Sequence, residues 1–172
     1  MMRSQSKSVC LCAVLSATGL MVSYVESFVV LPYGIPGIRI GLANIATLIA
    51  LYLLGGFYAF IVTVIRVMLS ALLFGSFSSF LYSIAGACLA LLAMTVFKRL
   101  GFSIYSVSVA GAVMHNTAQI AVAAVLMSGV YLLWYLPVLI FTGVMFGLLT
   151  GFLADILVKR LSKVLFSTGE GG

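Results

Sequence analysis

Seven side chains able to carry charge or form strong hydrogen bonds stand within or beside the long apolar runs of this sequence. An ionisable group at membrane depth costs roughly 2.5–3.5 kcal/mol, so such groups persist where they pair or bind a ligand. We take them as a candidate substrate-binding site in which guanidinium, carboxylate and amide groups hold a small organic solute. They are Glu26, Arg39, Asn44, Arg66, His115, Asn116 and Gln119.

The positions of these residues predict that they share the outer half of a membrane. Arg66 stands eight residues before Phe74, the outer end of its apolar segment, which places it ~12 Å deep at the helical rise per residue. His115 lies near the middle of a later segment, and Gln119 lies on the same helix face at i+4. Together they predict a pocket that opens outward and has His115 as its floor.

Each candidate also has a structural interpretation. Arg66 can extend toward the membrane surface or pair with Glu26 to hold two helices together. The three amides can form hydrogen bonds between helices, and His115 can bond a neighbouring hydroxyl. Sequence alone leaves both interpretations open.

Composition determines which elements position these residues. The chain has 172 residues, of which 64% are hydrophobic and 7% charged, and its mean hydropathy is +1.31. A soluble domain carries roughly 25% charged residues, so a cytosolic enzyme, a nucleic-acid binder and a disordered protein are excluded. At ~20 residues per crossing, the length accommodates about six spans.

We therefore predict an all-α, polytopic membrane protein with one integral membrane domain and six transmembrane helices. The residues between the first two spans, at about 26–41, form a lid-like outer loop punctuated by proline and glycine. Arg3 and Lys7 precede the first span as in a signal peptide, but no A-x-A pattern follows Val22, so we expect this span to be retained. The predicted spans are about 9–24, 42–54, 57–74, 77–97, 103–127 and 132–158.

The basic residues determine the predicted orientation. With both termini in the cytoplasm, that side of the membrane collects seven of the nine Lys and Arg residues, as the positive-inside rule requires. These seven are Arg3, Lys7, Lys98, Arg99, Lys159, Arg160 and Lys163.

Small residues and local charge pairs indicate how helices pack. Gly143, Gly147 and Gly151 recur every four residues, a spacing that brings two helix backbones close together and favours packing within the chain. Asp155 and Lys159 stand at i, i+4 and predict a local ion pair.

The sequence contains no recognisable catalytic or cofactor motif. No Cys/His set has the spacing of a zinc site, and no P-loop is present, so energy for transport has to come from a partner. We expect neither metal, cofactor nor nucleic acid to bind.

Six strings in order, spread over about residues 9–158, resemble one family, the Gx transporter family. This family is also labelled heptaprenyl diphosphate synthase component I, and it is similar to the substrate-binding S components of energy-coupling factor (ECF) transporters. The strings are VSYVES (22–27), PGIRIGLANI (36–45), RVMLSALLFG (66–75), FLYSIAG (80–86), GAVMHNTAQ (111–119) and YLPVL (135–139).

The resemblance implies a six-helix subunit in a bacterial plasma membrane that captures a small organic molecule from outside. Such a subunit would associate with a transmembrane coupling subunit and ATPase subunits. Ala13 and Ala17 match the A-x-x-x-A contact for the coupling subunit, and the outer loop matches the lid.

The synthase label implies a different role, as a membrane accessory protein of isoprenoid synthesis. Prenyl transfer needs clustered aspartates that hold magnesium on the diphosphate, and this sequence has a single aspartate, Asp155. We therefore expect a protein that is not itself an enzyme.

Overall fold

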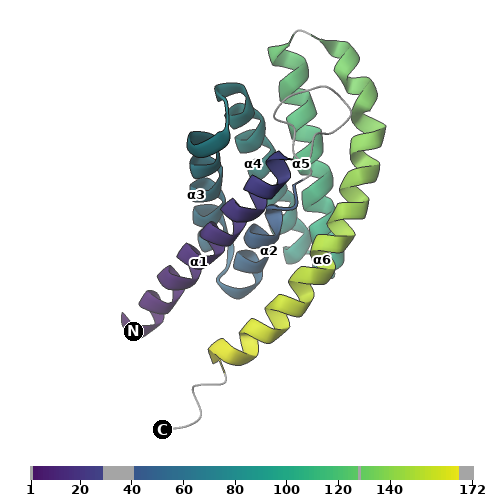
Figure 1. Ribbon diagram of the computed structural model, residues 1–172. Coiled ribbons are helices and arrows are strands. Elements are labelled where there is room, and N and C mark those ends of the chain that lie inside the picture. Colours follow the sequence, from purple (N-terminus) through teal and green to yellow (C-terminus); the bar gives the residue numbers. More distant parts are fainter. Residues whose placement is uncertain (1, 29–40, 128, 167–172) are drawn as a thin grey trace.

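Helices form all the regular structure in the part of the chain that the computed structural model describes, residues 2–28, 41–127 and 129–166 (Figure 1). The prediction of an all-α fold is confirmed, because no strand occurs in these ranges. The helices are α1 (Met2–Ser27), α2 (Asn44–Leu53), α3 (Gly56–Phe74), α4 (Phe77–Arg99), α5 (Ile104–Leu126), the 3₁₀ helix η1 (Val130–Tyr135) and α6 (Leu136–Phe166).

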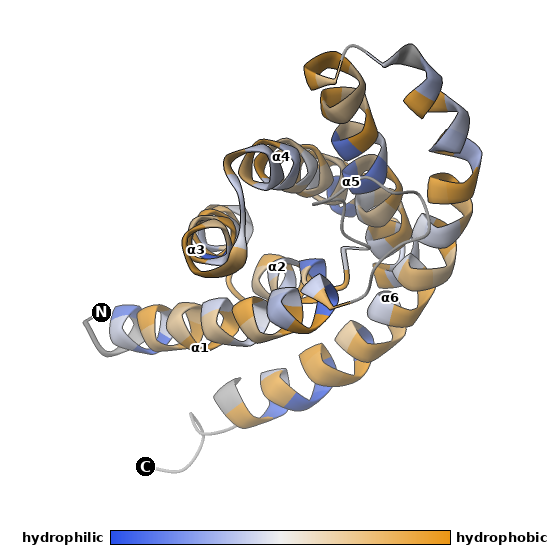
Figure 2. Ribbon diagram, turned by 45° about the horizontal axis from the view of Figure 1, so that its top comes forward, coloured by the Kyte–Doolittle hydropathy of each residue, from blue (hydrophilic) through white to orange (hydrophobic). Residues whose placement is uncertain are grey.

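Five of the described helices are long and apolar enough to cross a membrane, and apolar residues dominate the ribbon in Figure 2. The remaining apolar helix, α2, has ten residues. At 1.5 Å per residue it is about 15 Å long, roughly half of a bilayer core. The segment predicted at 42–54 is therefore helical but too short to span a membrane by itself.

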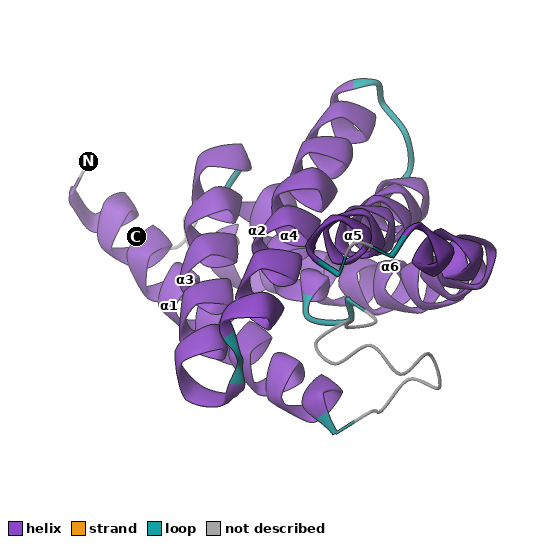
Figure 3. Cartoon of the chain, turned by 90° about the horizontal axis from the view of Figure 1, so that it is seen from above, coloured by secondary structure: helices purple, strands orange, loops and turns teal. Residues whose placement is uncertain are grey.

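The short helix α2 lies in the middle of the bundle and contacts α1, α3, α4, α5 and α6 (Figure 3). Seven of its ten residues are buried, as expected of a helix that is enclosed on all sides. On one side it contacts α1 and on another α6, and these two helices do not contact each other within the described residues. The start of α1 and the end of α6 lie at the same end of the molecule, the terminal end; we call the opposite end the far end (Figure 1).

Side chains from two neighbouring helices hold the ends of α2. At its start, Glu26 of α1 accepts hydrogen bonds from the backbone N–H groups of Leu42 (2.5 Å) and Ala43 (3.5 Å). At its end, Nζ of Lys98 from α4 donates to the carbonyl oxygen of Leu51 (2.6 Å). An acid at the N-terminus and a base at the C-terminus both complement the helix dipole. This complementary capping stabilises a helix that is too short to be stable alone.

The glycine stripe packs α6 against α5, so the prediction of packing within the chain is confirmed. A Cβ atom at Gly147 would lie 2.7 Å from Cα of Val109, and one at Gly151 would lie 3.1 Å from Cβ of Ser108. Within the same contact the hydroxyls of Ser108 and Thr150 share a hydrogen bond of 2.8 Å. The two backbones approach this closely because no side chain separates them.

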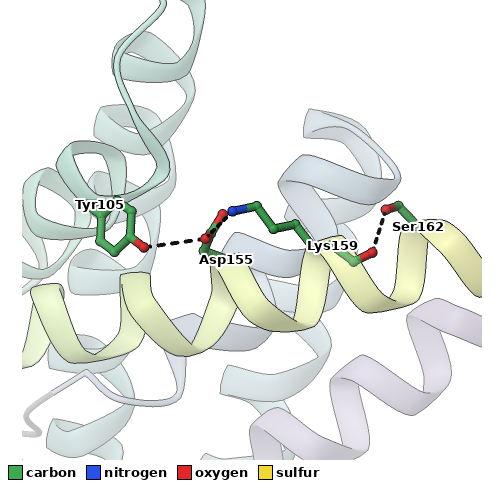
Figure 4. A network of polar contacts seen from close by, with 4 residues as sticks. All are labelled: Tyr105, Asp155, Lys159 and Ser162. Carbon is green, nitrogen blue, oxygen red and sulfur yellow. Dashed lines mark hydrogen bonds and ion pairs between the residues drawn. The ribbon is translucent and has the colours of Figure 1, made fainter.

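A polar network joins the outer surfaces of α5 and α6 near the terminal end (Figure 4). Nζ of Lys159 lies 2.7 Å from Oδ2 of Asp155, which confirms the predicted ion pair. The hydroxyl of Tyr105 also donates to this carboxylate, at 3.4 Å. The single aspartate of the chain thus takes part in a surface contact between two helices.

Candidate functional site

Arg66, at the middle of α3, extends a buried guanidinium group between α1 and α2. Its Nη1 donates to Oγ of Ser23 (3.3 Å), and its Nη2 donates to Oδ1 of Asn44 (3.2 Å). The stem of the side chain crosses α1 at Gly19, where a Cβ atom would lie 2.7 Å from Cδ of Arg66. Because Gly19 has no side chain, α1 leaves room for the Arg66 side chain to enter the bundle.

Asn44, the first residue of α2, accepts from Arg66 and lies beside Gly41, as His115 does. A Cβ atom at Gly41 would lie 3.2 Å from Nδ2 of Asn44 and 3.1 Å from Cδ2 of His115. Gly41 has a φ angle of +87°, a conformation that favours glycine. The amide and the imidazole therefore meet at a stretch of backbone that carries no side chain.

The imidazole of His115 lies between Gly41 and a second glycine, Gly86 of α4. A Cβ atom at Gly86 would lie 2.9 Å from Nδ1 and Cε1 of His115, and 3.0 Å from Cγ of Gln119. His115 and Gln119 therefore occupy the same face of α5, as their spacing predicts. Glycines on both sides give the ring a narrow slot in the bundle.

These contacts bring together polar side chains from four helices, each at most 5% exposed. We call this group the polar cluster. Large apolar side chains are exposed on the outside of the bundle, so the polar cluster lies inside a largely hydrophobic shell. Its members are Ser23 and Glu26 of α1, Asn44 of α2, Arg66 of α3, and His115 and Gln119 of α5.

Two predicted site residues do not join this group in the described structure. Asn116 points to α6, where its Nδ2 donates to the carbonyl oxygen of Leu139 (2.8 Å) and lies beside Gly143. Arg39 lies outside the described residues, as does most of the loop predicted at 26–41.

The sequence analysis missed Ser23 and the three glycines that make room for the cluster, Gly19, Gly41 and Gly86. Ser23 could have been found from its spacing on α1. Small or polar residues recur there every three or four positions and form one buried face, made of Ser16, Gly19, Ser23 and Glu26. A small and polar stripe on an otherwise apolar helix indicates a face turned toward polar neighbours.

A separate groove opens between α1 and α3 on the outside of the bundle. It encloses about 470 Å³ and is lined by Leu20, Met21, Tyr24, Val25, Leu73 and Phe74. These residues are apolar apart from the tyrosine hydroxyl, so the groove offers no charged or amide group to a solute and is distinct from the polar cluster.

The alanines predicted to contact a partner lie on a different face of α1 from the polar cluster. Ala13 and Ala17 are exposed, whereas Ser16 and Gly19 are buried. Within the described residues, no three His, Cys, Asp or Glu side chains gather in a way that could hold a metal ion.

The long apolar helices and the enclosed polar cluster define a membrane-embedded helical protein. The chain belongs to the heptaprenyl diphosphate synthase component I family, whose sequence model matches residues 15–157. This match confirms the family that the six strings indicated. Comparison with curated proteins and with solved structures gave no match.

Proposed function

We propose that this protein is the membrane-embedded, solute-binding subunit of an energy-coupling-factor-type importer. In this role the polar cluster binds a small organic solute that arrives from the outer side of the bacterial plasma membrane. The observation that carries the proposal is the convergence of Arg66, Asn44 and His115, from three helices, in the interior of an apolar bundle. Hydrogen bonds that only hold two helices together need one polar pair at a time. A solute-binding site needs several polar groups directed at one place.

Partner subunits supply the energy in this proposal. The exposed Ala13 and Ala17 form a small-residue surface on α1, which suits close approach by a helix of a coupling subunit. ATPase subunits attached to that coupling subunit would drive release of the solute to the inside.

The family's name favours a second candidate function, a non-catalytic membrane accessory protein of heptaprenyl diphosphate synthesis. The two functions differ in their partners. Affinity purification from native membranes should recover a coupling subunit and ATPases under the first proposal, and a soluble prenyl synthase under the second.

The solute site is tested with the double substitution Arg66→Gln and His115→Gln. Native mass spectrometry of the detergent-solubilised protein should detect a retained small molecule in the unchanged protein and none in the double variant. Arg160→Gln, which removes an exposed charge near the end of α6, serves as the control. Equal retention by a correctly folded double variant would contradict the site.

The partner surface is tested separately with Ala13→Leu and Ala17→Leu. Two leucines enlarge an exposed surface without touching the polar cluster, so the retained molecule should persist while the coupling subunit no longer co-purifies. Co-purification that is unchanged would exclude this surface as the contact.

A further inference from the structure

The apolar groove between α1 and α3 lies apart from the polar cluster and has no part in the proposed function. It encloses about 470 Å³ and is open to the outside of the bundle. Its lining comes from the last eight residues of α1 and the last two of α3, so it lies where both helices end, on the side away from the terminal end (Figure 1). The lining residues are Leu20, Met21, Tyr24 and Val25 of α1, and Leu73 and Phe74 of α3.

Two aromatic side chains join the helices at this groove. The rings of Tyr24 and Phe74 pack edge to face with their centroids 5.4 Å apart. Tyr24 also packs edge to face against Phe28, at 4.9 Å. Such aromatic pairs have a preferred geometry, so contacts on two sides hold the Tyr24 ring in place. This wall of the groove therefore has a defined shape.

The length of α3 places the groove near the edge of the membrane. The helix has 19 residues, so it is about 28 Å long, close to the roughly 30 Å thickness of the bilayer hydrocarbon. Its last two residues lie near the level at which acyl chains join the lipid headgroups. Tyrosine favours this level, because its ring is apolar and its hydroxyl polar.

The lining and the size of the groove restrict what can occupy it. Apart from the hydroxyl of Tyr24 its side chains offer only carbon and sulfur, and apolar cavities of this kind stay free of water. A stable protein interface takes about 20–30 residues on each side, whereas six residues line this groove. A single hydrocarbon chain matches both properties, and it would gain the dispersion contacts that an empty groove lacks.

We propose that this groove binds one acyl chain of a phospholipid from the membrane leaflet that surrounds it. The headgroup stays at the membrane surface, so recognition depends on the chain. The same two helices are joined by the hydrogen bond from Arg66 to Ser23, so a bound chain supports the contact between α1 and α3 beside the polar cluster. This lipid site is independent of the solute site, and either can fail without the other.

Leu73→Trp tests the groove from α3. An indole ring at this position overlaps the space of the chain, so the lipid should bind at least about tenfold more weakly. Leu72→Trp is the matched control, because Leu72 is the preceding residue of the same helix, is also exposed and does not line the groove. It should bind lipid as the unchanged protein does.

Val25→Trp and Val9→Trp repeat the comparison on α1. The two valines are equally exposed, at 62% and 63%, but only Val25 lines the groove. Val25→Trp should lose the lipid and Val9→Trp should keep it. All four substitutions are at exposed positions, so the midpoint of thermal unfolding should change little and shows that each variant is folded.

The probe is dioleoyl phosphatidylcholine, whose headgroup has no net charge to attract basic residues. Protein freed of lipid is titrated with it in detergent, and native mass spectrometry counts the lipids bound. The detergent is the same for all variants, so its own alkyl chain competes equally. We expect one bound lipid for each protein chain.

Two related probes separate the chain from the headgroup. Oleoyl lysophosphatidylcholine has the same headgroup with a single long chain and should bind. Dihexanoyl phosphatidylcholine has the same headgroup with short chains and should not.

Three outcomes would overturn the proposal. Equal lipid binding by Leu73→Trp and Leu72→Trp, or equal binding of the dihexanoyl and dioleoyl lipids, would exclude an acyl chain in the groove. An unchanged protein that binds no lipid would mean that another part of the chain closes the groove. A dimer that Leu73→Trp abolishes would assign the groove to a second copy of the protein.

Discussion

Glu26 and Lys98 belong to different helices, yet both act on the ends of α2. The acid meets N–H groups at the start of the helix, and the base meets a carbonyl oxygen at its end. Lys98 also lies 4.6 Å from the ring centre of Tyr52, a cation–π contact at the same helix end. The sequence could not reveal this capping, because it joins residues that are 16 positions apart in the chain.

Substituting Glu26→Gln should destabilise the fold by about 1–2 kcal/mol, since a neutral amide interacts less well with the N-terminus of α2. The midpoint of thermal unfolding in detergent should fall by roughly 2–4 °C per kcal/mol for a chain of this size. Fluorescence of the single tryptophan would follow the transition.

The control for this prediction is Arg160→Gln, which also removes one charge but at an exposed position. It should change the midpoint very little. If both variants unfold at the temperature of the unchanged protein, the capping of α2 by Glu26 contributes no measurable stability.

Which polar residues face one another was only partly predictable from spacing. His115 and Gln119 share a face as their i, i+4 relation requires, and the structure places both beside Gly86. Asn116 is turned about 100° from His115 on the same helix, and that rotation takes it to α6. Which neighbour lies on that side of α5 depends on how the helices are arranged, and the spacing of residues along one helix does not determine that arrangement.

The backbones of α5 and α6 approach each other closely where Gly143, Gly147 and Gly151 of α6 face α5. The predicted spans agree with α3, α4 and α5 to within two residues at each end, because hydropathy and turn residues determine these boundaries. The sequence did not reveal that Val130–Tyr135 forms a 3₁₀ helix before α6 begins. An apolar run that enters a helix through a 3₁₀ turn has the same hydropathy as one that is α-helical throughout.

Gly147→Ala should destabilise the fold by about 1–3 kcal/mol, the cost of overpacking a tight contact. Its Cβ atom would lie 2.7 Å from a backbone atom of Val109, and backbone cannot move aside as a side chain can. Gly56→Ala is the matched control, because nothing lies within 4 Å of a Cβ atom at that helical position.

The control should be neutral or stabilise the protein by up to about 1 kcal/mol, since alanine favours helix. Thermal unfolding of the two variants in the same detergent gives the comparison. An equal midpoint for both would mean that the contact between α5 and α6 is looser than the structure indicates.

As a whole, the molecule presents an apolar surface with aromatic residues at its far end. The most exposed large apolar side chain on η1 is that of Trp134, which is 86% exposed. Tryptophan favours the interface between lipid headgroups and hydrocarbon. The composition made the membrane class predictable at this scale, because so few charged residues cannot cover a protein in water.

In lipid vesicles, Trp134 should therefore lie close to the headgroups. Lipids brominated high on the acyl chain should quench its fluorescence more strongly than lipids brominated near the bilayer centre. Because the chain has one tryptophan, the signal comes from η1 alone. Stronger quenching from the bilayer centre would place η1 within the hydrocarbon and shift the predicted depth of α5 and α6.

The capping of α2 at both ends links two faces of the molecule mechanically. A displacement of the end of α1 that carries Glu26 would move the start of α2 with it. As a rigid helix, α2 would transmit that movement about 15 Å to Leu51 and so to Lys98 of α4. A change sensed by α1 at the start of α2 can thereby reach α4 at its end, carried by α2 itself.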